Sequence, residues 1–158
     1  ITGPEARADV HRLRAESGAV VVGAGTVRAD DPALTVRDAD GHDPLRLVLG
    51  PVDAGARVQP AESVTGELGD LLDDLGRRGV VQLLVEGGAH VAAGFHRQGL
   101  VDRYVLYLAP ALLGGDDGIP LFAGPGASTM AEVWRGRMVG VDRLGPDLRL
   151  DIVPLSGI

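Results

Sequence analysis

The segment AVVVGAGTVRADDP, residues 19–32, decides the fold class of this chain. It opens with the β-branched run Ala19–Gly23, which is typical of a buried strand. The preceding residues, Thr2 to Ser17, have helical periodicity. One face of this helix carries Ala6, Val10, Leu13 and Ser17, and a second stripe carries Arg7, His11 and Arg14. A helix that leads directly into a buried strand favours an α/β fold.

Helices and strands alternate through most of the remaining chain. Further strands are predicted at Leu45–Gly50, Val80–Gly88 and Val101–Pro110, and further helices at Gly66–Gly79 and Ala89–Gly99. Residues 137–153 alternate in places with period two around Gly145-Pro146, which predicts an antiparallel hairpin. We therefore expect one domain, residues 1–158, with a mainly parallel sheet flanked by helices and an antiparallel C-terminal hairpin.

The predicted helix ends carry their own signals. Thr2 and Glu5 fit a capping box at the start of the first helix, with Pro4 in its first turn. Because natural chains seldom begin on a cap, we expect further residues before Ile1. The helix over residues 66–79 is expected to face the core with four leucines and to end at Gly79: Leu68, Leu71, Leu72 and Leu75.

The composition excludes several classes of function. The 158 residues carry a formal net charge of −7 without a basic cluster, which argues against a nucleic-acid surface. The chain has no cysteine, so disulfides, thiol catalysis and thiolate metal sites are excluded. No apolar run approaches the roughly 20 residues of a membrane span, and no signal peptide is visible. We expect a cytoplasmic protein that does not bind membranes.

Two turns that contain glycine follow predicted strands, at Gly23–Pro32 and at Glu86–Gly88. Ligands of parallel sheets bind beyond the carboxyl ends of the strands, and Gly87-Gly88 before a helix suits a phosphate group. A tight turn is the alternative, since neither segment matches a dinucleotide fingerprint or a P-loop. Glu86 is either a surface carboxylate or a partly desolvated one that faces the ligand crevice.

Two arginines are candidates to bind an anion. Arg14 and Arg37 either converge on a phosphate or belong to solvated faces of their elements. Asp30-Asp31-Pro32 is interpretable as a simple turn. The histidines have no metal-ligand spacing, so surface or packing roles and no metal site are predicted for His11, His42, His90 and His96.

Four segments together resemble the reductase domain of the bifunctional riboflavin-biosynthesis deaminase/reductase family. They are ITGPEARADVHRLRA, GAGTVRADDPALTVR, LLVEGGAHVAAGF and GLVDRYVLYLAPALLGG, in the family's order. The resemblance implies a dihydrofolate-reductase-like fold and a homodimer. It also implies NADPH-dependent reduction of 5-amino-6-(5-phosphoribosylamino)uracil to 5-amino-6-(5-phosphoribitylamino)uracil. The small-residue turn Gly23–Thr26 would let the nicotinamide approach the sheet.

The resemblance also implies residue roles. Substrate contacts are implied for four residues, of which Glu86 is also the candidate catalytic group: Arg14, Leu34, Arg37 and Glu86. Cofactor contacts are implied for two residues of the first turn and for the start of the helix after Gly87, which would wrap the diphosphate: Thr26, Asp30, Gly88, Ala89, His90, Val91, Ala92, Ala93 and Gly94.

The chain departs from this family in three respects. The family's opening strand, with a Lys and a Ser-Leu-Asp-Gly motif, and nearby Ser and Trp site residues are absent from the sequence. No strand is visible between Val58 and Gly66. No deaminase domain is expected here, because a cysteine-free chain cannot supply its zinc ligands.

Two alternative functions stay open. One is another reductase of this fold, acting on a pterin or a different pyrimidine, although Arg14 with Arg37 favours a phosphorylated substrate. The other is a non-catalytic nucleotide-binding module, which loss of the opening strand would favour. The residues do not distinguish NADPH from NADH, because a basic partner for the 2′-phosphate cannot be placed.

Overall fold

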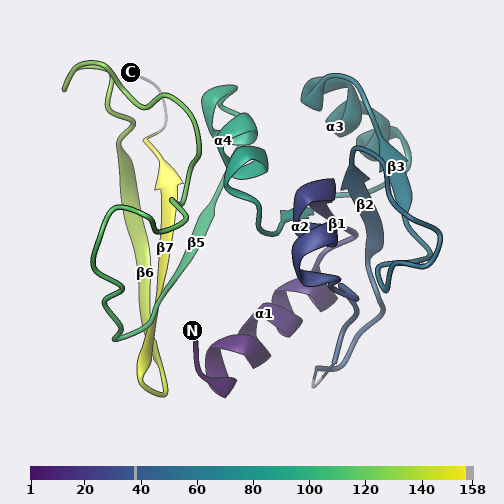
Figure 1. Cartoon of the computed structure of the whole chain (residues 1–158), viewed down its shortest axis with the longest axis horizontal. Coiled ribbons are helices and arrows are strands. Elements are labelled where there is room, and N and C mark those ends of the chain that lie inside the picture. Colours follow the sequence, from purple (N-terminus) through teal and green to yellow (C-terminus); the bar gives the residue numbers. More distant parts are fainter. Residues whose placement is uncertain (38, 156–158) are drawn as a thin grey trace.

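Two separate sheets form the framework of the chain (Figure 1). The structure is a computed structural model that describes residues 1–37 and 39–155. The first sheet is parallel, with strand order β3-β2-β1-β4: β1 (Ala19–Gly23), β2 (Leu45–Leu49), β3 (Glu62–Val64) and β4 (Leu83–Val85). The second sheet is antiparallel, with order β5-β7-β6: β5 (Tyr104–Leu108), β6 (Gly136–Leu144) and β7 (Asp147–Pro154).

The core lies on both faces of the first sheet. The helices of the described residues that accompany the strands are α1 (Pro4–Glu16), α2 (Ala24–Asp30), α3 (Leu68–Arg77) and α4 (Ala89–Arg97). Val20 and Val22 of β1 pack with α2 residues on one face, whereas Val21 packs with Leu75 and Phe95 of α3 and α4 on the other. Every residue of β1 is buried because both faces are covered. This burial explains why an uninterrupted apolar run forms the strand.

The parallel register aligns the ends of β1 and β2, with Gly23 opposite Leu49. β4 lies on the other side of β1, with Val21 opposite Val85. The segments after Gly23 and after Val85 therefore leave the same edge of the sheet. Ligands of parallel sheets bind at this edge.

A network of buried charged groups joins α1 to the second sheet. The Tyr107 hydroxyl and Arg149 Nη1 both donate to Asp9 Oδ2, at 2.6 and 2.8 Å. Arg149 Nε also donates to Asp151 Oδ2 at 3.0 Å. Burial raises the pKa of Asp9, but hydrogen bonds from Tyr107 and Arg12 and the charge of Arg149 outweigh it and leave that pKa below its ordinary value. Burial of the Tyr107 side chain and its hydrogen bond to Asp9 raise the pKa of Tyr107.

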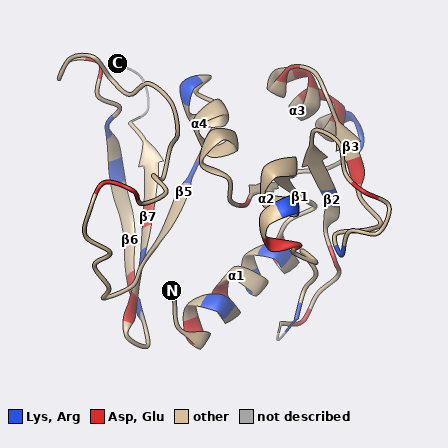
Figure 2. Cartoon of the chain, viewed as in Figure 1, with Lys and Arg blue, Asp and Glu red and all other residues tan. Residues whose placement is uncertain are grey.

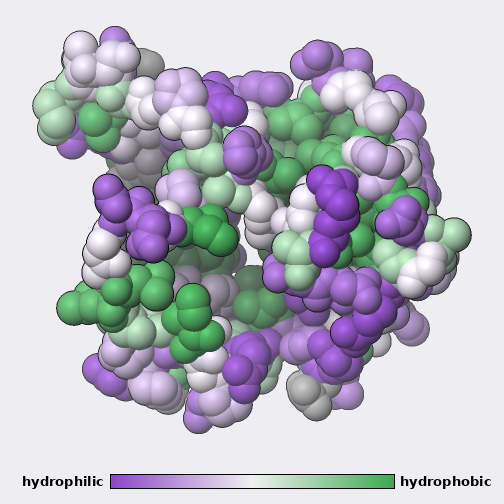
Figure 3. Space-filling view, in the orientation of Figure 1, coloured by the Kyte–Doolittle hydropathy of each residue, from purple (hydrophilic) through white to green (hydrophobic). Residues whose placement is uncertain are grey.

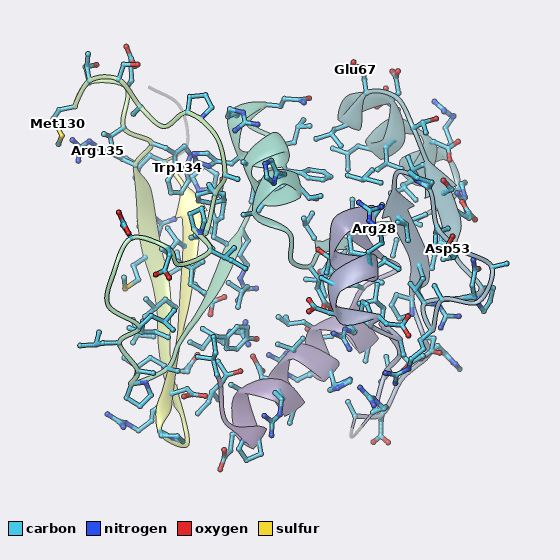
Figure 4. All side chains as sticks on the ribbon, viewed as in Figure 1. Arg28, Asp53, Glu67, Met130, Trp134 and Arg135 are labelled. Atoms are coloured by element: carbon cyan, nitrogen blue, oxygen red, sulfur yellow. The ribbon has the colours of Figure 1, made fainter. Side chains whose placement is uncertain are left out.

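Aromatic side chains fasten the long irregular segment 109–135 to α4 and β5. His96 stacks on Phe122 with ring centroids 4.6 Å apart, and its Nδ1 lies 2.7 Å from the Tyr104 hydroxyl oxygen. Trp134 meets Tyr104 edge to face at 4.8 Å, and Figure 4 shows it beside the second sheet. Contacts between these rings add to the area they bury. The prediction of a packing role is confirmed for His96.

The start of α1 differs from the prediction. Gly3, and not Thr2, is the N-cap, and no side chain of the segment caps the helix. Instead, the Gly3 N–H donates to Asp147 Oδ2 at 2.6 Å. The prediction of a capping box at Thr2 and Glu5 is wrong, because the Asp147 carboxylate of β7, and not Glu5, accepts the N–H of the N-cap residue.

Three strand assignments also need correction. β4 covers only residues 83–85, and Val81 is fully exposed, so the run from Val80 is not a buried strand throughout. β5 pairs antiparallel with β7 in the second sheet, which is separate from the parallel one. A strand does exist between Val58 and Gly66, namely β3, whose three residues are too few and too polar to give a hydrophobic pattern.

Each sheet has an edge strand that does not pair with the other sheet in the described part of the chain. β4 ends the first sheet and β5 ends the second. Leu83, Leu84 and Val85 of β4 are only half-buried. Figure 3 shows the surface hollowed between the two halves, with hydrophobic residues along the margin. Unpaired strand edges next to apolar side chains can accept a further extended segment.

Candidate substrate and cofactor site

The two glycine-containing segments of the sequence meet at the carboxyl edge of the first sheet. A Cβ added to Gly88 would lie 3.0 Å from Thr26 Oγ1, and one added to Gly23 would lie 2.9 Å from Val91 Cγ2. The missing side chains of Gly23 and Gly88 thus allow α4 to pack closely on β1 and α2. Residues 24–30 form α2 and not the predicted turn, so Thr26 points from a helix.

The start of α4 suits an anionic group. Gly87 and Gly88 have φ of 66° and 80°, conformations that favour glycine. Gly88 is the N-cap, no side chain among the described residues caps the helix, and the first turn has no acidic residue. The Ala92 N–H already donates to the Gly88 carbonyl. The N–H groups of the first turn, from Gly88 to Val91, are thus the donors that a phosphate would meet.

Arg14 and Glu86, both predicted at the substrate, contact each other. Arg14 Nε donates to Glu86 Oε1 at 2.5 Å and Nη2 donates to Oε2 at 2.6 Å, with side chains only 12% and 18% exposed. Arg14 Nη1 also donates to the Thr35 carbonyl at 3.2 Å. The Glu86 N–H donates to the Val21 carbonyl. These contacts set a partly desolvated carboxylate at the end of β4.

The end of α2 and the loop after it hold Asp30 and Leu34, which were also predicted to contact ligands. Asp30 is an exposed residue at the end of α2, and within residues 1–37 and 39–155 its carboxylate makes no hydrogen bond. Asp31 adopts a left-handed conformation and accepts the Arg57 N–H at 2.8 Å. Leu34 has φ of 52° and a side chain 3% exposed in the core. Any ligand contact of Leu34 therefore involves its main chain.

Arg37 lies beside α1 at a basic pocket. Its N–H donates to His11 Nδ1 at 3.1 Å. A cavity of about 510 Å³ is lined by Pro4, Arg7, Ala8, His11 and Arg37. Arg7 and His11, for which the sequence predicted no site role, line this cavity together with Arg37.

The described residues contain neither a candidate metal site nor a candidate membrane-spanning helix. Over residues 1–37 and 39–155, no three histidine or acidic side chains are grouped so as to hold a metal ion. No helix in that part of the chain is long and apolar enough to cross a membrane.

Residues 1–150 match the family model described as the RibD C-terminal domain. The chain belongs to this family. RibD of Mycobacterium tuberculosis, a riboflavin biosynthesis protein, is 40% identical over 164 residues, which cover 97% of this chain and 47% of that protein. The chain spans about half the length of the curated RibD relatives it matches.

Solved structures agree with this assignment to the RibD C-terminal family. Acinetobacter baumannii RibD superimposes with a TM-score of 0.88 at 30% identity, over 98% of this chain and 52% of that one. The Saccharomyces riboflavin biosynthesis reductase Rib7 gives a TM-score of 0.71 at 18% identity, over 96% of this chain and 82% of that one. The latter likeness shows the fold alone. The expected α/β fold and the resemblance to the riboflavin-biosynthesis family are confirmed.

Proposed function

We propose that this chain is an NADPH-dependent reductase of riboflavin biosynthesis. Its substrate would be 5-amino-6-(5-phosphoribosylamino)uracil and its product the ribitylamino compound. Membership of the RibD C-terminal family supports this proposal. The observation that carries it is the convergence of Arg14 and Glu86 beside the uncapped helix start at Gly88, at one sheet edge.

The residues present fit a dinucleotide. The first turn of α4 offers main-chain donors, positive φ at Gly87 and Gly88 and no acidic side chain, a combination that favours a diphosphate. Thr26 Oγ1 lies next to Gly88 and would contact the same ligand. Ala93 is 1% exposed. The later residues of the 88–94 segment would therefore pack beneath the first turn of α4 and not contact the ligand.

The reaction requires the ribosylamine ring to open to an imine before reduction. NADPH, when bound, would supply a hydride to C1′ and a proton would reach the nitrogen, so that imine, NADPH and H⁺ give the amine and NADP⁺. Glu86 is proposed to orient the substrate by accepting hydrogen bonds, since Arg14 holds both of its oxygens in place. Such positioning is the main contribution a protein makes to hydride transfer.

The test is the loss of reduced-nicotinamide absorbance with the ribosylaminouracil phosphate as substrate. We expect turnover with NADPH and a lower kcat/KM with NADH. A dihydropterin substrate serves as the comparison and should give no turnover. Binding of NADPH without reduction of either substrate would favour a nucleotide-binding module.

We further propose that the family's opening strand completes this single reductase domain. β4 and β5 are edge strands of the two sheets, and Figure 3 shows the surface hollowed between the two halves of the molecule. A strand between β4 and β5 would join both sheets. Protein extended by that strand should unfold at higher urea concentration than residues 1–158 alone. Equal midpoints would contradict the placement.

A homodimer in the cytoplasm is also part of the proposal. β6 is an outer strand with exposed apolar side chains, including Met138 at 54% and Val141 at 55%. Two β6 strands paired antiparallel about a two-fold axis between Val139 and Gly140 would set Arg137 opposite Asp142 and Met138 opposite Val141. Light scattering should give twice the chain mass, and Val141→Asp should give the monomer.

A further inference from the structure

The irregular segment 109–135 is hydrogen-bonded to α4 through a single residue, Ala123. The Ala123 N–H donates to the Ala89 carbonyl at 3.0 Å, and Arg97 Nη1 donates to the Ala123 carbonyl at 3.0 Å. Over residues 1–37 and 39–155, these are the hydrogen bonds that join the segment to the rest of the chain. Ala89 and Arg97 are the first and last residues of α4, so both ends of the helix hold Ala123. Figure 1 shows the segment alongside α4.

The residues on either side complete the attachment. The Phe122 ring stacks on His96 with 4.6 Å between the centroids. Gly124 has φ of 96°, and a Cβ added there would lie 3.2 Å from Arg97 Nη1. The missing side chain of Gly124 therefore leaves room for the guanidinium group. Residues 122–124 form what we call the α4 strap.

Arg97 supplies a charged donor to the α4 strap. Figure 2 shows the charged positions of α4, with a basic one in the last turn and no acidic one. Arg97 is exposed, and in the described part of the chain it forms no ion pair. Its guanidinium donates to the carbonyl of Ala123 instead. Because charged donors make stronger hydrogen bonds than neutral ones, replacement of Arg97 should loosen the strap.

The hydrogen bond from Ala123 ends on a peptide group of the turn that is proposed to bind the cofactor. The Ala89 carbonyl and the His90 N–H belong to the same peptide group. Because that group is planar, a donor fixed at its oxygen also fixes the direction of its N–H. The His90 N–H lies in the first turn of α4, among the donors proposed for the diphosphate. A hydrogen bond at the carbonyl also polarises the peptide group and strengthens the bond that its N–H makes.

We propose that the α4 strap positions the turn that receives the cofactor diphosphate. Ala123 orients the His90 N–H, and Arg97 and Phe122 are the positioning residues that keep Ala123 in place. This inference rests on the proposed function and deepens it. Coupling between two binding events is reciprocal. A docked strap that favours NADPH is therefore favoured by bound NADPH to the same degree.

The first experiment measures NADPH affinity without turnover. NADPH is titrated by fluorescence into wild-type protein, Arg97→Ala, Arg97→Lys and the control Arg77→Ala. Arg77 is the last residue of α3, as Arg97 is of α4, and it pairs with Asp74 of its own helix. We expect Arg97→Ala to weaken NADPH binding about fivefold or more, the lower end of typical coupling between sites. Arg97→Lys keeps a charged donor and should recover most of this loss, and the control should match wild type.

The second experiment tests whether the α4 strap responds to the cofactor. Hydrogen exchange of the Ala123 N–H is followed by NMR without NADPH and with saturating NADPH. The Arg57 N–H, which donates to Asp31 Oδ1 at 2.8 Å, is the control for general stabilisation. We expect NADPH to slow exchange at Ala123 about fivefold or more and to leave Arg57 unchanged. A strap with only a structural role would not respond to NADPH.

The outcomes separate this inference from the proposed reaction. Wild-type affinity in Arg97→Ala, a loss that Arg97→Lys does not recover, or equal slowing of exchange at Ala123 and Arg57 would overturn the role of the strap alone. Coupling of NADPH to the strap without reduction of the ribosylaminouracil phosphate would support the strap and overturn the reaction. No saturable binding of NADPH to wild-type protein would overturn both.

Discussion

Arg14 and Glu86 lie 72 positions apart in the chain and hold each other through two hydrogen bonds of 2.5 and 2.6 Å. One residue comes from the last turn of α1 and the other follows β4. The contact therefore links the helix that precedes the first sheet to the edge where ligands of such sheets bind. Replacement of either residue leaves the partly buried charge of the other without its partner.

Replacement of Glu86 tests whether it binds substrate or transfers a proton. In Glu86→Gln we expect KM for the ribosylaminouracil phosphate to rise roughly tenfold while kcat changes little. A fall in kcat of about 10²-fold would instead indicate proton transfer. Steady-state kinetics on protein that includes the opening strand measures both constants.

Glu62→Gln is the matched control for this experiment. Glu62 also forms a bidentate pair, with Arg78 at 2.8 and 2.9 Å, but on β3 and away from the site. Its kinetic constants should equal those of wild type. Wild-type constants in Glu86→Gln as well would remove Glu86 from the site.

Gly88→Ala should weaken the binding of NADPH. The residue has φ of 80°, and the new Cβ would lie 3.0 Å from Thr26 Oγ1, where the diphosphate is proposed to bind. We expect at least a tenfold loss of affinity, about 1.4 kcal/mol, measured by NADPH fluorescence. Gly99→Ala is the control, because Gly99 has φ of 66° with no atom near its Cβ. Equal effects of both variants would assign the loss to backbone strain.

Gly23→Ala should destabilise the fold through α4. Its Cβ would lie 2.9 Å from Val91 Cγ2, closer than carbon atoms tolerate. We expect the free energy of unfolding to fall by about 1–3 kcal/mol in urea titrations, the usual cost of overpacking. Val91→Ala in the same chain should recover part of that loss. A double variant less stable than Gly23→Ala would show that the collision is not the cause.

The Asp9 contacts should make stability depend on pH in acid. The pKa of Asp9 is lowered in the folded state, so its contribution is fully present above the ordinary value of 3.8 and is lost as pH falls through the lower folded value. Asp9→Asn should cost about 1–3 kcal/mol at neutral pH. The difference from wild type should shrink below about pH 4.

Urea titrations across this pH range measure the effect. Asp73→Asn, at an exposed position of α3, is the control and should show a small difference at every pH. A difference for Asp9→Asn that stays constant down to pH ~3 would contradict a contribution from the ionised Asp9.

The sequence predicts an element well where its own pattern is complete. β1 is predicted to the residue, because strands on both sides and helices on both faces require an uninterrupted apolar run. α2 is mistaken for a turn, because its small residues and the following Asp-Pro resemble a loop. The antiparallel pairing of β5 with β7 cannot be predicted locally, since Tyr104 pairs with the distant Ile152.

The candidate site is predictable to a similar degree. Gly87-Gly88 before a helix indicates an anion site from local pattern alone, and the structure shows a helix start without a side-chain cap there. The contact of Arg14 with Glu86 depends on the fold, so the residues alone left both with surface alternatives. The burial of Leu34 likewise depends on a left-handed backbone that a leucine seldom adopts.

The aromatic contacts of segment 109–135 supply an optical reporter. The chain has one tryptophan, Trp134, and it lies against Tyr104 and 5.8 Å from the His96 ring. Its emission therefore comes from a single environment, and release of the segment would shift that emission to longer wavelength as water reaches the indole. Undocking of this segment can thus be followed by fluorescence without any added dye, independently of the unfolding of the first sheet.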